Sequence, residues 1–200
     1  MRRNNLKISK LKSYFLLCII LICFNVIQVS AADYFTMNDH TLNGGVGNYG
    51  YSRRYYFIDS SASSSSYAIH QAMSEWVDTQ TITSLSFRET SDQPSSVIDI
   101  YSTSDQSSSS NGWTEFFSWG TQIDPASENW GWNKIFINTY YYNNLEDYEQ
   151  KGVLAHEMGH CFGLNENNTN HNSIMAQSIY GRYVYRAQEC DLNGINYLYH

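Results

Sequence analysis

Positive charge is scarce in this sequence. The 200 residues include 12 lysines and arginines against 19 aspartates and glutamates, which gives a net charge of −7 at pH 7. Five of the 12 basic residues stand within the first 12 positions, so the rest of the chain is more acidic still. Because an acidic surface repels phosphate groups, we expect neither nucleic acid nor an anionic membrane surface to be a partner.

Long hydrophobic runs are also rare. The segment Tyr14–Phe24 is almost wholly apolar, but it is shorter than the roughly 20 residues of a membrane-spanning helix, and no second such run follows. It lies between the basic start and the small residues Val29-Ser30-Ala31-Ala32, which suit a cleavage site. Residues 1–32 are therefore predicted to be a secretory signal peptide, with a membrane anchor as the alternative.

Cleavage of that peptide would leave a strongly acidic protein. Seven basic residues would remain against 19 acidic ones, a net charge of −12. We expect this mature form to be a secreted, extracellular monomer with no stable membrane association.

Cysteine is sparse as well, with four in the chain. Cys18 and Cys23 fall within the predicted signal peptide, and neither stands in a lipobox. Cys161 and Cys190 remain. In an oxidising compartment they could form one disulfide, or they could be two buried free thiols.

Hydrophobic periodicity predicts one domain over residues 55–200, preceded by an irregular, glycine-rich arm over residues 33–54. The predicted strands are residues 55–59, 84–89, 97–102 and 134–138. The predicted helices are residues 69–80, 146–161 and 191–199. The first helix can act as the crossover of a βαβ unit.

Two further features have ordinary structural interpretations. His70 falls off the apolar face of the first predicted helix, which favours a surface residue over a metal ligand. The segment 113–131 is rich in aromatic residues, which we expect to pack in the core and loops rather than contact a substrate: Trp113, Phe116, Phe117, Trp119 and Trp130.

The clearest chemistry lies at His156, Glu157 and His160. On a helix, positions i and i+4 share one face, about 6 Å apart at Cβ, so both imidazoles can bind one metal ion. Glu157 stands beside the pair and can take the proton of a water molecule. This H-E-x-x-H spacing is the arrangement of zinc peptidases.

A third ligand has to come from elsewhere, because catalytic zinc takes three protein ligands and keeps a fourth position open. Gly163 is suited to end the helix and turn the chain back, so Glu166, six residues after His160, can reach the metal. His171 is the alternative. A third possibility is that water takes the place of the third protein ligand and that the metal binds weakly.

Together these residues resemble the metzincin clan of zinc endopeptidases, and within it the matrixin-like secreted peptidases. The motif H-E-x-x-H-x-x-G-x-x is followed by a Ser-Ile-Met turn that ends at Met175. Residues 56–76, 135–138 and 191–199 resemble the first strand and helix, the last strand before the active-site helix, and the closing helix. One departure is Glu166, because this position normally holds His, or Asp in a minority.

The resemblance, over roughly residues 50–199, implies an α+β fold of the α/β type. It would have a twisted, mostly parallel sheet of about four or five strands with three helices. It also implies a secreted zinc metalloendopeptidase that hydrolyses protein or peptide substrates, with Glu157 as general base and Met175 as a hydrophobic floor beneath the ligands. The alternative function is a catalytically weak or inactive peptidase-like binding protein or adhesin. Glu157 speaks against it, because a binding module has no need of a base.

The resemblance bears on other metals too. A structural zinc would need further histidines in the middle of the domain, and none stands between His70 and His156, so we expect one catalytic zinc alone. Asp124 and Glu128 could contribute to a calcium site, although no motif supports one.

Overall fold

The computed structural model describes residues 34–47, 54–77 and 85–199 of the chain. The predicted signal peptide, residues 1–32, lies outside these ranges, as does the predicted end of the first helix near residue 80. Among the helices that are described, none combines the length and the hydropathy of a membrane span.

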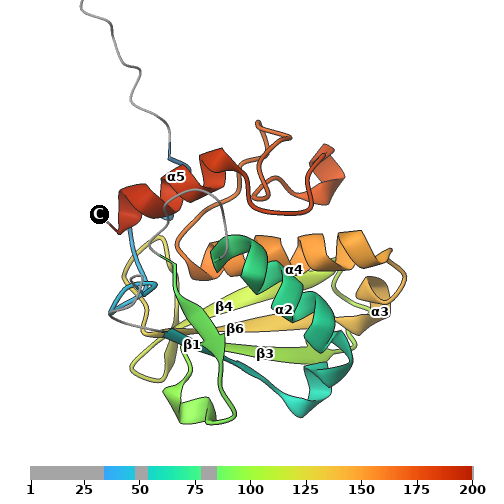
Figure 1. Cartoon of the computed structure of the whole chain (residues 1–200), viewed down its shortest axis with the longest axis horizontal. Coiled ribbons are helices and arrows are strands. Elements are labelled where there is room, and N and C mark those ends of the chain that lie inside the picture. Colours follow the sequence, from blue (N-terminus) through green and yellow to red (C-terminus); the bar gives the residue numbers. More distant parts are fainter. Residues whose placement is uncertain (1–33, 48–53, 78–84, 200) are drawn as a thin grey trace, which may run out of the picture. The chain divides into compact units, whose positions relative to one another are not determined.

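A six-stranded mixed sheet forms the framework, in the order β2-β1-β3-β6-β4-β5 (Figure 1). Its strands are β1 (Arg54–Ile58), β2 (Phe87–Glu89), β3 (Ile98–Thr103), β4 (Gly112–Ser118), β5 (Thr121–Ile123) and β6 (Trp132–Asn138). The first four strands in the spatial order are parallel, whereas β4 is antiparallel to both β6 and β5. The predicted α+β class is confirmed, with six strands instead of four or five.

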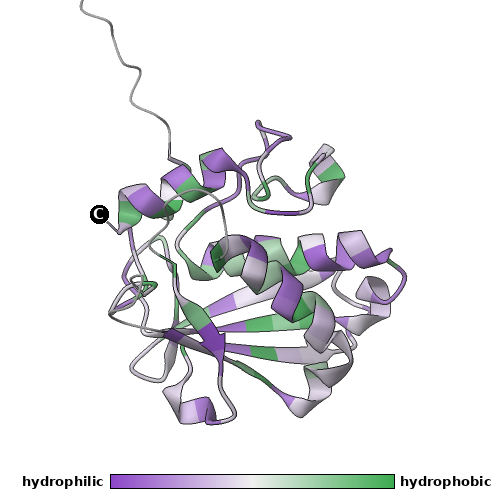
Figure 2. Ribbon diagram, viewed as in Figure 1, coloured by the Kyte–Doolittle hydropathy of each residue, from purple (hydrophilic) through white to green (hydrophobic). Residues whose placement is uncertain are grey.

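The three predicted helices are present as α2 (Ser66–Val77), α4 (Asp147–Cys161) and α5 (Glu189–Leu198). The single turn α3 (Thr139–Tyr142) and three short 3-10 turns complete the helical elements of the described residues: η1 (Ser60–Ser65), η2 (Gln93–Ser95) and η3 (Ser178–Tyr180). Helices α2 and α4 lie on the same face of the sheet (Figure 1). Hydrophobic residues gather where they meet the strands (Figure 2), so the core lies between these two layers.

Strands β4 and β5 are absent from the sequence prediction, which assigned their aromatic residues to core and loop packing. Aromatic side chains occupy both faces of β4: Phe116 is buried toward the helices, and its neighbour Phe117 lies on the opposite face. This pattern hides the two-residue alternation that marks a half-buried strand. Trp119 lies at the β4–β5 turn with a φ of 50°. Its side chain is fully exposed, so the prediction that it packs in the core or a loop is wrong.

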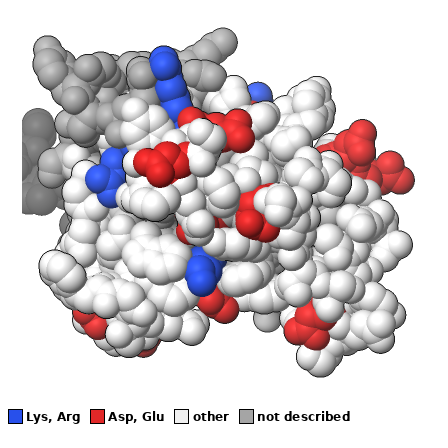
Figure 3. All heavy atoms as spheres, turned by 90° about the horizontal axis from the view of Figure 1, so that it is seen from below, with Lys and Arg blue, Asp and Glu red and all other residues white. Residues whose placement is uncertain are grey.

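The face of the sheet away from the helices carries stacked aromatic rings. Phe117 stacks on Trp132 with 4.3 Å between ring centroids, and Trp113 stacks on Phe136 at 5.0 Å. Lys134 lies 5.0 Å from the centre of the Phe117 ring. Most of the surface seen from this side is neither acidic nor basic (Figure 3). These stacked pairs cover the strands on the side that has no helix layer.

Helix α4 is buried along most of its length, which fits a helix that crosses a sheet beneath other elements. A capping box formed by Glu146 and Glu149 satisfies backbone N–H groups at its start. The indole of Trp76 in α2 donates to the carbonyl of Ala155 in α4, at 3.0 Å. These contacts fix the helix that carries the H-E-x-x-H residues.

The described part of the predicted arm, residues 34–47, holds no helix or named strand and packs against the domain. Leu42 and Val46 are each 1% exposed. Thr36 forms an antiparallel bridge with Leu164, just after α4, and Leu42 forms a parallel bridge with Trp130. The arm therefore supports the segment that follows α4.

We predict that Leu42→Ala lowers the free energy of unfolding by about 2–5 kcal/mol, because it leaves a cavity where the arm meets the core. Ile179→Ala removes the same kind of apolar side chain from a site that is 81% exposed, so it should change stability by only about 0.5 kcal/mol. Urea unfolding of both variants tests this. Equal small effects would show that the burial of Leu42 does not stabilise the fold.

Candidate metal centre and active site

Two imidazoles on α4 point toward each other. The Nε2 atoms of His156 and His160 are 3.1 Å apart, and the two rings meet edge to face. The Nδ1 atom of His156 lies 2.9 Å from the carbonyl oxygen of Ile174, and that of His160 lies 2.9 Å from the carbonyl oxygen of Leu164. A carbonyl only accepts hydrogen bonds, so each Nδ1 carries the proton. In its neutral form, each ring then presents its Nε2 lone pair to the space between them.

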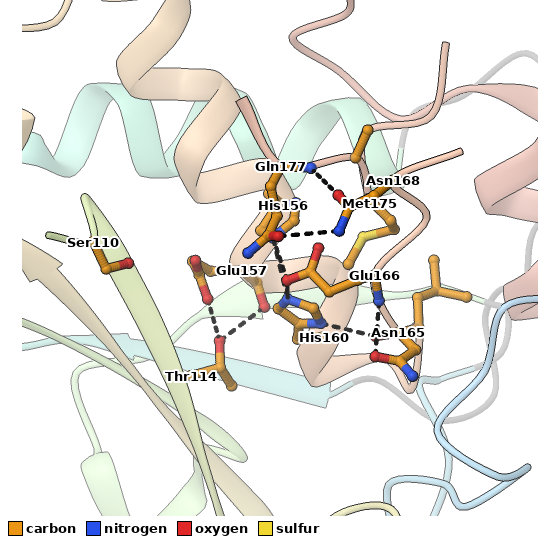
Figure 4. Close-up of polar contacts among 12 residues, drawn as sticks. Ser110, Thr114, His156, Glu157, His160, Asn165, Glu166, Asn168, Met175 and Gln177 are labelled. Carbon is orange, nitrogen blue, oxygen red and sulfur yellow. Dashed lines mark hydrogen bonds and ion pairs between the residues drawn. The ribbon is translucent and has the colours of Figure 1, made fainter. Parts of the chain in front are cut away.

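Glu166 brings a carboxylate to the same space (Figure 4). Its Oε1 atom lies 3.5 Å from Nε2 of His156 and 3.4 Å from Nε2 of His160. The three ligand atoms lie within 4.8 Å of one another, and no other group of three or more such side chains was found among the described residues. His171, the alternative third ligand, is outside this group, and its ring packs on Tyr183 instead.

The chain reaches Glu166 through a reversal at Gly163. Helix α4 ends at Cys161, and Gly163 has a φ of 104°, a conformation that favours glycine. A Cβ atom at this position would lie 2.7 Å from the Leu198 side chain. Met37 of the arm donates its backbone N–H to the carbonyl of Gly163 at 3.0 Å, which holds the reversal in place.

The proximity of these groups changes their acidity. Burial acts to raise the pKa of Glu166, but hydrogen bonds and charge from His156 and His160 outweigh it and lower that pKa to about 2. For His160, burial acts to lower the pKa, and the opposing effects of Glu166, Glu157 and the Leu164 carbonyl raise it overall. Glu166 is therefore ionised at neutral pH. Protons on the imidazoles would compete with a metal ion.

This donor set fits a zinc ion. Two imidazole nitrogens and one carboxylate oxygen match a known set for catalytic zinc. Ligands bound at about 2.0–2.1 Å in tetrahedral geometry lie roughly 3.3 Å apart, close to the separations here. The second carboxylate oxygen of Glu166, Oε2, is buried and has no hydrogen-bond partner. A cation in the space between the three side chains would relieve that unsatisfied charge.

Glu157 lies next to this group, and its position depends on β4. The side chain is 6% exposed, and its Oε2 accepts a hydrogen bond from the hydroxyl of Thr114 at 2.8 Å (Figure 4). Thr114 did not emerge from the sequence analysis, because β4 was not predicted. Once β4 is known, the alternation of a strand gives Thr114 the same face as Phe116, toward α4.

The Ser-Ile-Met turn is anchored by a buried carboxylate. Asp191 of α5 accepts hydrogen bonds from the Ser173 hydroxyl, from the backbone N–H of Ile174 at 3.0 Å and from that of Gln188 at 2.8 Å. Met175 is fully buried, and its sulfur packs against Gly159 of α4. The turn thus positions the Ile174 carbonyl that orients His156.

A cavity of about 450 Å³ opens beside these residues. Its lining includes residues 109–114, residues 177–179 and Arg182. Met37 of the arm also contributes to the wall. The two imidazoles and the two carboxylates of the site also line this cavity: His156, His160, Glu157 and Glu166.

The remaining predicted residues lie elsewhere. Cys161 is buried and Cys190 is half-buried, and both are free thiols, so the disulfide is not formed. Burial raises the pKa of the Cys161 thiol well above its usual value, which makes it unreactive. His70 pairs with Glu89 at 3.0 Å on the surface, in agreement with the surface position expected for it. Asp124 accepts the backbone N–H of Ala126 within its own turn.

Comparison with known protein families gives one match. The model of the matrixin family matches residues 48–200, about three quarters of the chain. No curated protein matches the sequence.

We predict that Gly159→Ala lowers the free energy of unfolding by about 1–3 kcal/mol, because the new Cβ would overlap the sulfur of Met175 and crowd Trp76. In Gly159→Ala/Met175→Ala the methyl group enters space that the methionine has left. The double variant should therefore lose less stability than the two single variants combined. Additive losses in urea unfolding would contradict this contact.

Proposed function

The chain belongs to the matrixin family and is accordingly a zinc metalloendopeptidase, and from this premise we propose that His156, His160 and Glu166 hold its zinc ion while Glu157 serves as general base. The observation that carries the ligand assignment is the convergence of three ligand atoms within 4.8 Å. A bound zinc ion supplies Lewis acidity, which polarises the scissile carbonyl and makes water more acidic.

Glu157 has the position that a general base requires. It borders the cavity beside the proposed ligands, where its carboxylate can take a proton from the attacking water and return one to the leaving amine. The Thr114 hydroxyl, 2.8 Å from Oε2, orients this carboxylate, and Oε1 remains for the water. Thr114 is thus a positioning residue for the base.

Strand β4 offers the substrate a place to bind. One edge of β4 pairs with β6 along its length, whereas β5 pairs on the other edge with Phe116–Ser118 alone. In the described pairing, the edge of residues 112–115 is open on this side, and residues 112–114 line the cavity. An extended peptide can add to such an edge through main-chain hydrogen bonds, which would bring its carbonyl groups past Glu157.

We also propose that the protein acts outside the cell. The support is the basic start, the short apolar run and the small residues before Asp33. The acidic character of the remaining chain suits a soluble exported enzyme that acts on proteins or peptides.

The activity is tested with casein as substrate, with and without a zinc chelator. We predict that the chelator abolishes hydrolysis and that added zinc restores it. Glu157→Gln keeps the shape of the side chain but removes the base, so it should lower kcat by about 100-fold or more. Hydrolysis that is unchanged by chelator and by this substitution would overturn the proposal. Zinc binding without any hydrolysis would favour the inactive binding protein.

The third ligand is tested by zinc affinity. We predict that Glu166→Ala weakens zinc binding by more than about 100-fold, because it removes a charged donor from the metal. His171→Ala is the matched control and should bind zinc as the unmodified protein does. Zinc lost from the His171 variant alone, measured by elemental analysis after dialysis, would contradict the assignment.

A further inference from the structure

Among the residues that line the cavity, Arg182 is the one lysine or arginine. It follows η3 and packs against α4 opposite Gly152, where a Cβ atom would lie 3.1 Å from its Nη2 atom. Its guanidinium carbon is 6.0 Å from the centre of the Tyr185 ring. Gly152 thus leaves room for a large cationic group one helical turn before His156.

Half of the guanidinium is held by the protein. Its Nη1 atom donates to the carbonyl oxygens of Ile174, at 3.2 Å, and Ala176, at 3.4 Å. Because His156 Nδ1 donates to the same Ile174 oxygen, Arg182 lies directly behind a proposed zinc ligand. Its position is therefore fixed relative to the reacting centre.

The other half has no acceptor. The Nε atom is buried without a hydrogen-bond partner, and no bond of Nη2 is found among the described residues. No carboxylate in the described part of the chain lies within 4.0 Å of the guanidinium. Because Nε is inaccessible, Nη2 is the atom left to pair with a carboxylate oxygen, and leaving it unpaired in a half-buried position costs free energy.

Charge balance in the cavity points the same way. Glu157 and Glu166 are the two carboxylates that line it, and a zinc ion would offset both of their charges. Asp191 also acts on Arg182 through its charge, but it does not line the cavity and already accepts hydrogen bonds from Ser173, Ile174 and Gln188. Within the cavity, the charge of Arg182 would then have no partner. Burial lowers the pKa of the Arg182 guanidinium, but an arginine stays protonated at neutral pH.

Positioning the Ser-Ile-Met turn accounts for only part of this arrangement. That role uses Nη1 alone and explains neither the unpaired Nη2 atom nor the cavity that Arg182 lines. The apolar side chains of Val153 and Ile179 also line the cavity, so a ligand there would be partly withdrawn from water. Withdrawal from water strengthens a charge-assisted hydrogen bond.

We propose that Arg182 forms a subsite that selects an acidic side chain, Asp or Glu, on a substrate residue adjoining the cleaved bond. This inference rests on the proposed function and names the substrate class of the same site. The carboxylate of the substrate accepts a hydrogen bond from Nη2 and supplies a counter-charge within the cavity.

The test begins with the unmodified, zinc-loaded enzyme and a library of peptides blocked at both ends. Peptides that differ only by Glu or Gln beside the cleaved bond are compared by kcat/KM. A charge-assisted pair in this setting predicts a preference for Glu of about 10-fold or more. Cleavage with equal or lower efficiency for Glu at both flanking positions would overturn the acidic subsite and leave the peptidase intact.

The enzyme variants assign the preference to Arg182. Arg182→Gln should bring the Glu-to-Gln ratio close to one, whereas Arg182→Lys keeps the charge, loses the fork and should retain part of the preference. Thermal unfolding and zinc content are measured for both, because Nη1 also holds the turn. A ratio unchanged in Arg182→Lys and in Arg182→Gln would contradict the assignment.

Binding provides a readout that needs no turnover. Fluorescence anisotropy of labelled Glu and Gln peptides is measured on Glu157→Gln, with and without Arg182→Gln. We predict tighter binding of the Glu peptide by about 10-fold, lost in the double variant. If no library peptide is hydrolysed, the proposed function fails. The binding measurement still tests the subsite in that case, and equal affinities for the Glu and Gln peptides would refute the subsite.

Discussion

The chain reversal at Gly163 is the constraint on which the site depends. Two ligands four residues apart follow from any helix, but a third requires the chain to leave the helix and return to the same face within six residues. Gly163 permits this with a φ of 104°, in a position where a side chain would strike Leu198. The arm, bridged to Leu164, and the Asp191-anchored turn hold the two sides of the reversal. Much of the packing outside the sheet thus serves to keep one carboxylate beside two imidazoles.

The use of glutamate at this point has electrostatic consequences. A carboxylate pairs favourably with protonated imidazoles, which is why the pKa of Glu166 falls to about 2 and that of His160 rises. It also cancels one unit of charge on a bound metal ion, so the water there should be less acidic than with three imidazoles. Arg182, held behind His156 through the Ile174 carbonyl, adds a positive charge nearby. The site therefore combines a carboxylate, the proposed anionic ligand, with a fixed cation.

Local sequence could predict the parts of the site that local geometry determines. The helical repeat placed His156, Glu157 and His160 on α4, and the spacing after Gly163 brought Glu166 forward ahead of His171. Contacts between distant segments could not be predicted from the sequence. Thr114 depends on β4, whose aromatic residues on both faces hide its alternation, and Arg182 depends on how the segment after η3 folds back on Gly152. The arm looks irregular in sequence because its buried residues contact distant segments. Leu42 forms a bridge with Trp130, and the Val46 carbonyl accepts the backbone N–H of Ser86.

The central claim is that two imidazoles and one carboxylate bind a single zinc ion. X-ray absorption at the zinc edge of the metal-loaded protein tests it directly, because imidazole rings give distinctive multiple scattering. The account predicts two imidazole nitrogens at about 2.0–2.1 Å, with the remaining ligands being oxygen. Three imidazoles, or any sulfur ligand at about 2.3 Å, would contradict it.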